Sequence, residues 1–314
     1  MRITKPIPGK ECFNMKKRKK ATGEVLTYNL MMLPVMVLII IFSIIPLLGL
    51  VIAFQNYIPA KGILGSPWVG FDNFSYMFIM PDSWQVLSNT IVMALGKMVM
   101  GIIVPVLFAL MLNEIKARKY KRVVQTVVYM PYFLSWVILA SVFTNLLSLD
   151  GVLNAVVKAF GGEPIMFLGS NTWFQPTMII TDVWKNFGYG AIIYLAALTS
   201  IDASLYEAAS IDGASHMKQI WHITLPAIIP TVVLMGTLSL GNILNAGFDQ
   251  IFNLYNPAVY KTADIIDTYV YRMGLVDLQF SLGTAVGMMK SVVSFVLITI
   301  SYYLAGRFAG YRIF

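Results

Sequence analysis

Long apolar segments alternate with shorter polar segments along most of the chain. Some apolar stretches contain no Asp, Glu, Lys or Arg at all: residues 25–60, 123–149, 186–201, 219–248 and 291–306. A helix that crosses a membrane needs about 20 predominantly apolar residues. The pattern therefore predicts an all-α integral membrane protein with six transmembrane helices, at residues 31–54, 89–112, 123–146, 177–198, 226–244 and 284–305.

The polar segment between the fourth and fifth predicted spans is more than a simple connection. Its pattern predicts a short amphipathic helix over residues 204–210, a turn at Asp212 and Gly213, and a second amphipathic run at 217–221. Pro226 then opens the fifth span, because proline fits the first turn of a helix, where its missing N–H costs nothing. A compact helix–turn–helix of this kind predicts a docking element.

Basic residues are distributed unevenly between the two sides of the predicted membrane. One side carries most of them: Arg2, Lys5, Lys10, Lys16, Lys17, Arg18, Lys19, Lys20, Lys116, Arg118, Lys119, Lys121, Arg122, Lys218, Arg307 and Arg312. The connections on the other side contain only Lys61, Lys158, Lys261 and Arg272. Because Lys and Arg concentrate in cytoplasmic loops, both termini and the loop at 202–224 are predicted to be cytoplasmic. The protein is then a multi-pass protein of the cell membrane.

Composition supports one transmembrane domain. The chain has 314 residues, of which 58% are hydrophobic and 12% charged, whereas soluble domains carry about 25% charged residues. We divide it into a basic cytoplasmic tail, residues 1–29, and a transmembrane domain, residues 30–314. The net charge of +8 follows from topology beside anionic lipid headgroups, so we expect no nucleic acid partner.

The residue types that enzymes need are missing from plausible positions. No G-x-x-x-x-G-K-[ST] phosphate loop occurs, so this chain does not hydrolyse nucleotides by that route. His216 and His222 are six residues apart and do not form the i, i+4 pair of a zinc site. Cys12 is the only cysteine, which excludes an internal disulfide. We expect no catalytic residue, no metal site and no enzymatic activity.

The docking segment resembles a known signature. Its residues match the spacing E-A-A-x3-G-x9-I-x-L-P, with the fixed positions at Glu207, Ala208, Ala209, Gly213, Ile223, Leu225 and Pro226. This signature is typical of the permease subunits of bacterial ABC importers. The segment at 195–215 resembles the maltose-type sugar branch, and the segments at 256–275 and 280–292 resemble its polysaccharide and complex-oligosaccharide group. The resemblance covers the chain from about residue 30 onward.

The resemblance implies a type I ABC importer permease fold with a cytoplasmic coupling helix, in loop 202–224. The signature residues and Asp212 would couple the chain to an ATPase, with Glu207 facing a basic residue there. The implied partners are a second homologous permease, two ATPase subunits, an extracellular solute-binding protein, the saccharide and membrane lipid. No cofactor is expected on this chain, since ATP and Mg²⁺ would bind to the ATPases. A simpler interpretation of Glu207 is that it caps or solvates a surface helix.

Ionisable residues inside the predicted spans are costly, about 2.5–3.5 kcal/mol each on insertion scales, and mark paired or functional positions. Asp182 and Lys185 are at i, i+3, a spacing that places them on one helix face. We expect them to form a mutual ion pair, with substrate contact as the alternative. Lys97 and Lys290 could extend toward the membrane surface or bind carbonyl groups of neighbouring helices.

Candidate cargo contacts gather at the outer end of the fifth span. Amide and carboxylate groups bind sugars through hydrogen bonds, and Asn242, Asn245, Asp249 and Gln250 supply them there. Aromatic faces bind sugars as well, and Tyr189 and Tyr194 lie in the fourth span. Tyrosines in spans also serve simply as packing residues or interface anchors.

Three other functions compete with the sugar permease. The same permease class could carry a peptide, phosphate or lipid, because the signature does not discriminate among cargoes. An ion-coupled carrier using Asp182, Lys185 and Lys290 would transport without ATP. A membrane enzyme of lipid or glycan metabolism would need an acidic or histidine site, which the sequence lacks.

Overall fold

The structure is a computed structural model that describes residues 22–308. These residues form helices and connecting turns without a β-sheet. Contacts divide the chain at residue 50 into two units. The first unit contains α1 (Thr22–Ile39), a π-helical turn (Ile40–Ile44) and α2 (Ile45–Leu47). Its apolar side chains from Val25 to Leu48 are largely exposed within this chain, as expected of a helix that faces lipid.

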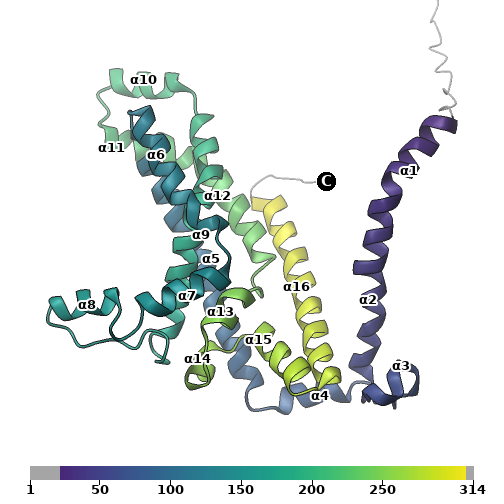
Figure 1. The fold of residues 1–314 in the computed structure, drawn as a ribbon. Coiled ribbons are helices and arrows are strands. Elements are labelled where there is room, and N and C mark those ends of the chain that lie inside the picture. The colour runs from purple at the N-terminus through teal and green to yellow at the C-terminus, as the bar shows by residue number, and fades with distance from the viewer. Residues whose placement is uncertain (1–21, 309–314) are drawn as a thin grey trace, which may run out of the picture. The chain divides into compact units, whose positions relative to one another are not determined.

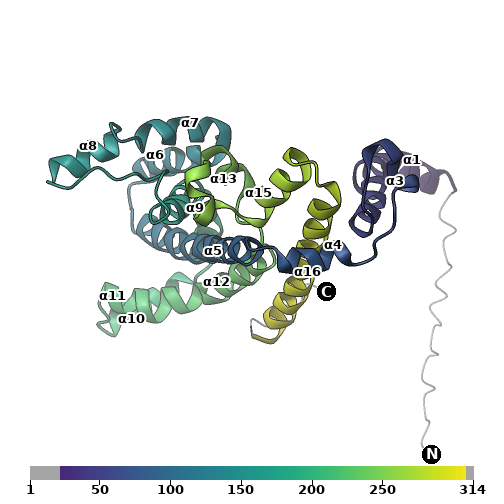
Figure 2. The ribbon, with the colours of Figure 1, turned by 90° about the horizontal axis from the view of Figure 1, so that it is seen from below.

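The second unit contains the remaining helices. They are α3 (Gly62–Gly65), α4 (Asp72–Ile79), α5 (Ser83–Asn113), α6 (Arg118–Tyr129), α7 (Trp136–Leu146), α8 (Val152–Ala159), α9 (Phe174–Thr199), α10 (Ala203–Ile211), α11 (His216–Gln219), α12 (Leu225–Leu240), α13 (Phe248–Leu254), α14 (Tyr260–Ala263), α15 (Ile266–Tyr271) and α16 (Phe280–Phe308). Figures 1 and 2 show α8 projecting beside α7.

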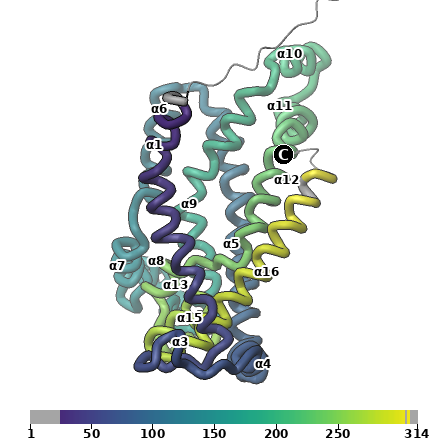
Figure 3. Tube along the Cα trace, turned by 90° about the vertical axis from the view of Figure 1, so that its right-hand side faces the viewer, coloured from purple at the N-terminus to yellow at the C-terminus, as the bar shows by residue number. Residues whose placement is uncertain are grey.

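Long helices form the body of the second unit. α5 packs along α9, and α12 packs against α16, α9 and α5; Figure 3 shows these helices running lengthwise. The close approach of α6 to α9 requires a glycine, because a Cβ atom at Gly188 would lie 2.5 Å from the backbone oxygen of Val128. The packed arrangement leaves α10 and α11 at one end of this unit, and α4, α14 and α15 near the other (Figure 1).

The predicted fold class is confirmed, with corrections to individual spans. Among residues 22–308, four helices are long and apolar enough to cross a membrane, or up to six if each of two bent helix pairs is one span. The third predicted span is not straight: residues 118–133 and 136–146 meet at 103°. The bend follows a 3₁₀ turn at Met130–Phe133, which contains Pro131, and Ser135 caps the next helix by accepting from Ile138 N. Proline cannot donate a helical hydrogen bond, so the helix ends there.

Two predicted boundaries also differ from the structure. The fifth span was expected to continue to residue 244, but α12 ends at Leu240 and the chain turns at Gly241. At the N-terminus, residues 1–21 of the expected tail lie outside the described residues, and α1 already begins at Thr22. Residues 22–29 therefore belong to the first helix.

Candidate functional site

The predicted docking segment forms two short helices at one end of the second unit. α10 is capped by Asp202, whose carboxylate accepts a hydrogen bond from the backbone N–H of Ser204 at 2.9 Å. This bond satisfies an N–H that the helix itself leaves unpaired, and it lowers the pKa of the Asp202 carboxyl below its ordinary value. A helix of nine residues is thereby given a defined start.

Gly213 fixes the turn between the two helices. Its φ of +74° lies in the left-handed region, which glycine adopts without the steric cost that a side chain brings. The N–H of Gly213 donates to Ser210 O at 3.1 Å, and the N–H of Ala214 donates to Ala209 O at 2.9 Å. These bonds form a Schellman motif, a standard helix end. A Cβ atom at position 213 would meet nothing within 4 Å, so the glycine serves the backbone rather than packing within this chain.

Side chains then tie the segment to its neighbours. Tyr206 Oη lies 3.0 Å from Thr224 Oγ1, and Gln219 Nε2 donates to Ser210 Oγ at 2.9 Å. His216 Nε2 lies 2.7 Å from Glu114 Oε2 at the end of α5. Nothing in the sequence indicates these contacts, because their members have no spacing that sets them apart from other polar residues. They make the segment a braced element rather than a loose loop.

The signature residues occupy different environments within this braced segment. Glu207 and Ala208 on α10 are exposed, as are Asp212 and Pro226, whereas Ala209, Ile223 and Leu225 are half-buried. The side chain of Glu207 makes no hydrogen bond or ion pair with any residue that the structure describes. It does not cap α10, since Asp202 does so. Its carboxylate is therefore available to a partner.

Large apolar side chains are exposed on the same segment as Glu207. Ile211 is 87% exposed, and Leu205, Met217 and Trp221 are each more than half exposed. Exposed apolar groups gathered in one place typically mark a contact surface for another protein. An acidic group among apolar ones, on a braced helix, is suited to docking and force transfer.

The expected ion pair between Asp182 and Lys185 is wrong. Asp182 instead lies 3.9 Å from Lys97 Nζ on α5. Lys185 Nζ donates to Tyr132 O at 2.9 Å and lies over the rings of Tyr132 and Trp136, 5.3 and 5.8 Å from their centroids. Each charged group thus finds a partner on a neighbouring element, because helix packing brings those partners closer than the side chain one turn away.

Two lysines of the spans converge on the interrupted helix between α12 and α13. Lys97 Nζ donates to Ala246 O at 2.6 Å and also to Gln250 Oε1. Lys290 Nζ donates to Asn245 Oδ1 at 2.8 Å and to Asp267 Oδ1 at 2.5 Å. Cations stabilise the free carbonyls of a helix break. Two of the residues predicted to contact cargo are therefore held in place, Gln250 from α5 and Asn245 from α16.

The predicted cargo contacts separate into accessible and buried residues. Asn242, Asn245 and Asp249 are exposed, and Tyr189 is 45% exposed with its ring stacked 3.9 Å from that of Tyr132. Gln250 is fully buried, and its Nε2 donates to Met178 O and Thr181 Oγ1, both at 2.8 Å. Gln250 therefore holds α13 against α9 in this structure.

Tyr194 also differs from the prediction. Its side chain is 3% exposed and lies in an apolar cluster formed by α5, α9 and α12. A residue in such a core contributes to packing, so Tyr194 does not line an accessible path here.

Comparison with known proteins now identifies the family. The profile of the family described as binding-protein-dependent transport system inner membrane component matches residues 101–310, which contain the whole docking segment. The chain belongs to this permease family.

Similar permeases are known by sequence. The permease is 42% identical over 300 residues to the polygalacturonan/rhamnogalacturonan transport system permease protein YteP of Bacillus subtilis, covering 94% of each chain. It is 33% identical to the lactose transport system permease protein LacF of Rhizobium radiobacter, covering 70% of this chain and 73% of that one. These matches extend well beyond the docking segment.

A solved structure is similar as well. It is a chain in the crystal structure of a bacterial ABC transporter involved in the import of the acidic polysaccharide alginate, with 37% identity and a TM-score of 0.83, covering 91% of this chain and 96% of that chain. Family and fold agree, so this permease is a membrane-embedded transport subunit of an ABC importer that works with a binding protein, and it is not a catalytic chain.

Proposed function

We propose that this permease forms, with a second related permease, the membrane path of an ATP-driven importer for oligosaccharides or polysaccharide fragments. An extracellular solute-binding protein delivers the cargo, and two ATPase subunits that bind ATP and Mg²⁺ drive the cycle. The observation that carries the proposal is the braced segment from Asp202 to Pro226, with its Schellman turn and exposed Glu207. The saccharide cargo is supported by the polysaccharide, lactose and alginate systems in which similar chains work.

ATP-driven closure of the ATPase subunits would move α10, and the movement would pass to the membrane helices. The contacts that support this route are Glu114 with His216, which links α5 to α11, and Tyr206 with Thr224, which links α10 to the start of α12. In the proposed orientation this end faces the cytoplasm, together with both termini. The uneven distribution of basic residues supports that orientation.

The cargo path passes the helix break in this proposal. Asn242, Asn245 and Asp249 supply exposed polar groups there, and Tyr189 supplies an aromatic face. Lys290 holds Asn245 directly, and Lys97 holds the neighbouring backbone at Ala246. Such support keeps polar groups pre-organised, which lowers the entropy lost on binding.

The test is reconstitution of the complete complex in liposomes with its binding protein. Glycans loaded on the binding protein are screened for stimulation of ATP turnover and for uptake. Glu207→Lys and Gly213→Arg should abolish both, while the complex still assembles. Glu163→Lys, the same charge change on another exposed residue, is the matched control.

Two results would refute the proposal. Full ATPase stimulation in Gly213→Arg complexes would contradict the coupling role of the segment. Uptake of a peptide, phosphate or lipid, but of no glycan, would replace the saccharide with another cargo.

A further inference from the structure

A second polar region lies at the opposite end of α5 from the docking segment. Here a cavity of about 590 Å³ opens between the start of α5 and the connection from α13 to α16. Small-molecule sites typically measure about 300–1,000 Å³, so the cavity has room for a few sugar rings. Its lining includes Asp82, Gln85, Tyr260, Lys261, Arg272 and Asp277. None of these was singled out as a cargo contact from the sequence.

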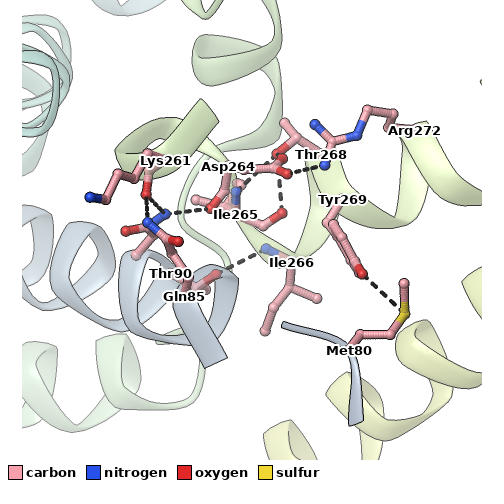
Figure 4. Close-up of polar contacts among 11 residues, drawn as sticks. Met80, Gln85, Thr90, Lys261, Asp264, Ile265, Ile266, Thr268, Tyr269 and Arg272 are labelled. Atoms are coloured by element: carbon pink, nitrogen blue, oxygen red, sulfur yellow. Dashed lines mark hydrogen bonds and ion pairs between the residues drawn. The ribbon is translucent and has the colours of Figure 1, made fainter. Parts of the chain in front are cut away.

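Buried polar contacts hold the wall of this cavity in place. Asn89 Nδ2 donates to Lys261 O and to Asp264 O, both at 3.1 Å. The backbone N–H of Ile266 donates to Thr90 Oγ1 at 2.9 Å (Figure 4). The connection is therefore anchored to α5 through side chains from the first two turns of that helix. An anchored wall is pre-organised for a ligand.

Arg272 is fixed within this wall. Its Nη2 donates to Asp264 Oδ2 at 2.5 Å, and Thr268 Oγ1 donates to the other carboxylate oxygen of Asp264 at 2.6 Å (Figure 4). The guanidinium lies 4.6 Å from the ring centroid of Tyr260 and 5.7 Å from that of Tyr269. Since guanidinium has five N–H donors in a planar fork, the pair with Asp264 leaves donors for a ligand.

The charges at the rim favour hydroxyl groups over a carboxylate. Asp82 and Asp277 are exposed and acidic, while Arg272 is neutralised by Asp264. Lys261 is exposed, and its ammonium has no ion-pair partner among residues 22–308. Carboxylates accept hydrogen bonds from hydroxyl groups, and tyrosine rings offer apolar faces to the C–H face of a sugar. Two acidic groups against one basic group would repel an acidic sugar unit.

We propose that this cavity is an outer subsite for a hydroxyl-rich saccharide segment, occupied before the cargo reaches the helix break. This inference rests on the proposed saccharide function and adds a second place of recognition on the same chain. Asp82 and Asp277 accept hydrogen bonds from sugar hydroxyls, Arg272 donates to a sugar oxygen, and Tyr260 supplies the apolar wall. The subsite selects neutral units of a glycan over uronate units.

The experiment uses the complete complex and a double variant, Asp82→Ala with Asp277→Ala. Neither carboxylate is needed for the fold, because both side chains are exposed and Asp82 makes no capping hydrogen bond at the start of α5. Asp150→Ala is the matched control, since this exposed residue lies outside the cavity. Binding of a neutral galactose trisaccharide and a galacturonate trisaccharide is followed by saturation-transfer NMR.

The wild-type complex should bind the neutral trisaccharide more tightly than the acidic one. The double variant should bind the neutral one at least about fivefold more weakly, because a net hydrogen bond contributes about 1 kcal/mol, and Asp150→Ala should match the wild type. The subsite is overturned if the wild-type complex binds neither trisaccharide, or if the double variant binds the neutral trisaccharide as tightly as the wild type does. It is also overturned if the double variant docks the binding protein, loaded or empty, more weakly while its trisaccharide binding is unchanged. That last result would assign the cavity to the binding protein.

The two proposals fail in different ways. If the wild-type complex imports no glycan from its binding protein, the saccharide function itself is refuted. If import proceeds and the double variant behaves like Asp150→Ala, only the outer subsite is refuted.

Discussion

Substitutions of Gly213 can show whether a glycine is needed there for its backbone conformation or for the space that it leaves to the ATPase. The residue has φ +74°, and a Cβ atom there would meet nothing of its own chain within 4 Å. Gly213→Ala therefore introduces backbone strain of about 1–2 kcal/mol, the cost of a left-handed conformation for an ordinary residue. Asn tolerates this conformation because its side chain bonds locally, although it is larger than Ala.

This strain energy is comparable to the energy of the side-chain hydrogen bonds that hold the docking segment together. Two side-chain hydrogen bonds, from Tyr206 to Thr224 and from Gln219 to Ser210, contribute about 1 kcal/mol each on a typical net scale. Adding 1–2 kcal/mol of strain reduces the population of the native turn relative to its open forms by about 5–30-fold, at roughly tenfold for each 1.4 kcal/mol. ATPase stimulation in Gly213→Ala complexes should thus fall several-fold.

The assay is ATP turnover of the reconstituted complex at saturating loaded binding protein, with co-purification of the ATPase as a check on assembly. Gly213→Asn should retain most of the stimulation that Gly213→Ala loses. If Asn is as damaging as Ala, or worse, the glycine is required for room against the ATPase rather than for its φ angle. The backbone explanation would then be abandoned.

Further predictions concern the membrane path and the outer region. Lys97→Met should lower the free energy of unfolding by about 2–3 kcal/mol, because it leaves buried acceptors unpaired. Thermal unfolding in detergent measures the lost stability, and Lys97→Arg should recover part of that stability. Alanine at Asn242 or Asn245 should raise the KM for loaded binding protein without uncoupling ATP turnover from uptake; an unchanged KM in both removes them from the path. Burial first, and then neighbouring Tyr260 and Asp264, raise the pKa of Tyr255 to about 12. Its neutral form is favoured in the folded state, so this stabilisation is complete below the ordinary pKa of about 10 and is lost as the pH rises to about 12. Tyr255→Phe should remove that alkaline loss of melting temperature, and an unchanged pH profile would contradict it.

The positions of helices could be predicted from the sequence, but the bend in the third span could not. Runs of apolar residues locate α5, α9, α12 and α16 within a few residues, since hydrophobic length is a local property. The bend at 133–136 arises where Pro131 ends one helix and Ser135 begins another. Both residues are visible in the sequence, yet proline is tolerated inside other helices here, as Pro105 in α5 shows. Only packing distinguishes the two cases.

Pairing of charges was the least predictable part of the site. Asp182 and Lys185 are neighbours on one helix, and a sequence offers no other partner as near. In the folded chain, Lys97 reaches Asp182 from α5, and Lys185 bonds to Tyr132 O. Partners on other elements are used because a buried polar group is costly unless it is paired, and these partners lie closest in the folded chain. The helix and turn of the docking segment were predictable by contrast, since they depend on neighbouring residues, but its capping residue, Asp202, was not predicted.

The docking segment, the helix break and the outer cavity all contact one element, α5. Its C-terminal end holds His216 of the docking segment through Glu114, its middle holds the helix break through Lys97, and its N-terminal end holds the outer cavity through Asn89. α5 remains helical from Ser83 to Asn113 and packs along α9, so a displacement at one end is carried along its length rather than absorbed by a hinge. Energetic coupling between distant sites requires an element whose position both sites bias. α5 contacts all three regions, so it can be such an element. Loss of Lys97 should therefore affect cargo recognition and ATPase coupling together, whereas a change confined to Asn242 should affect cargo recognition alone.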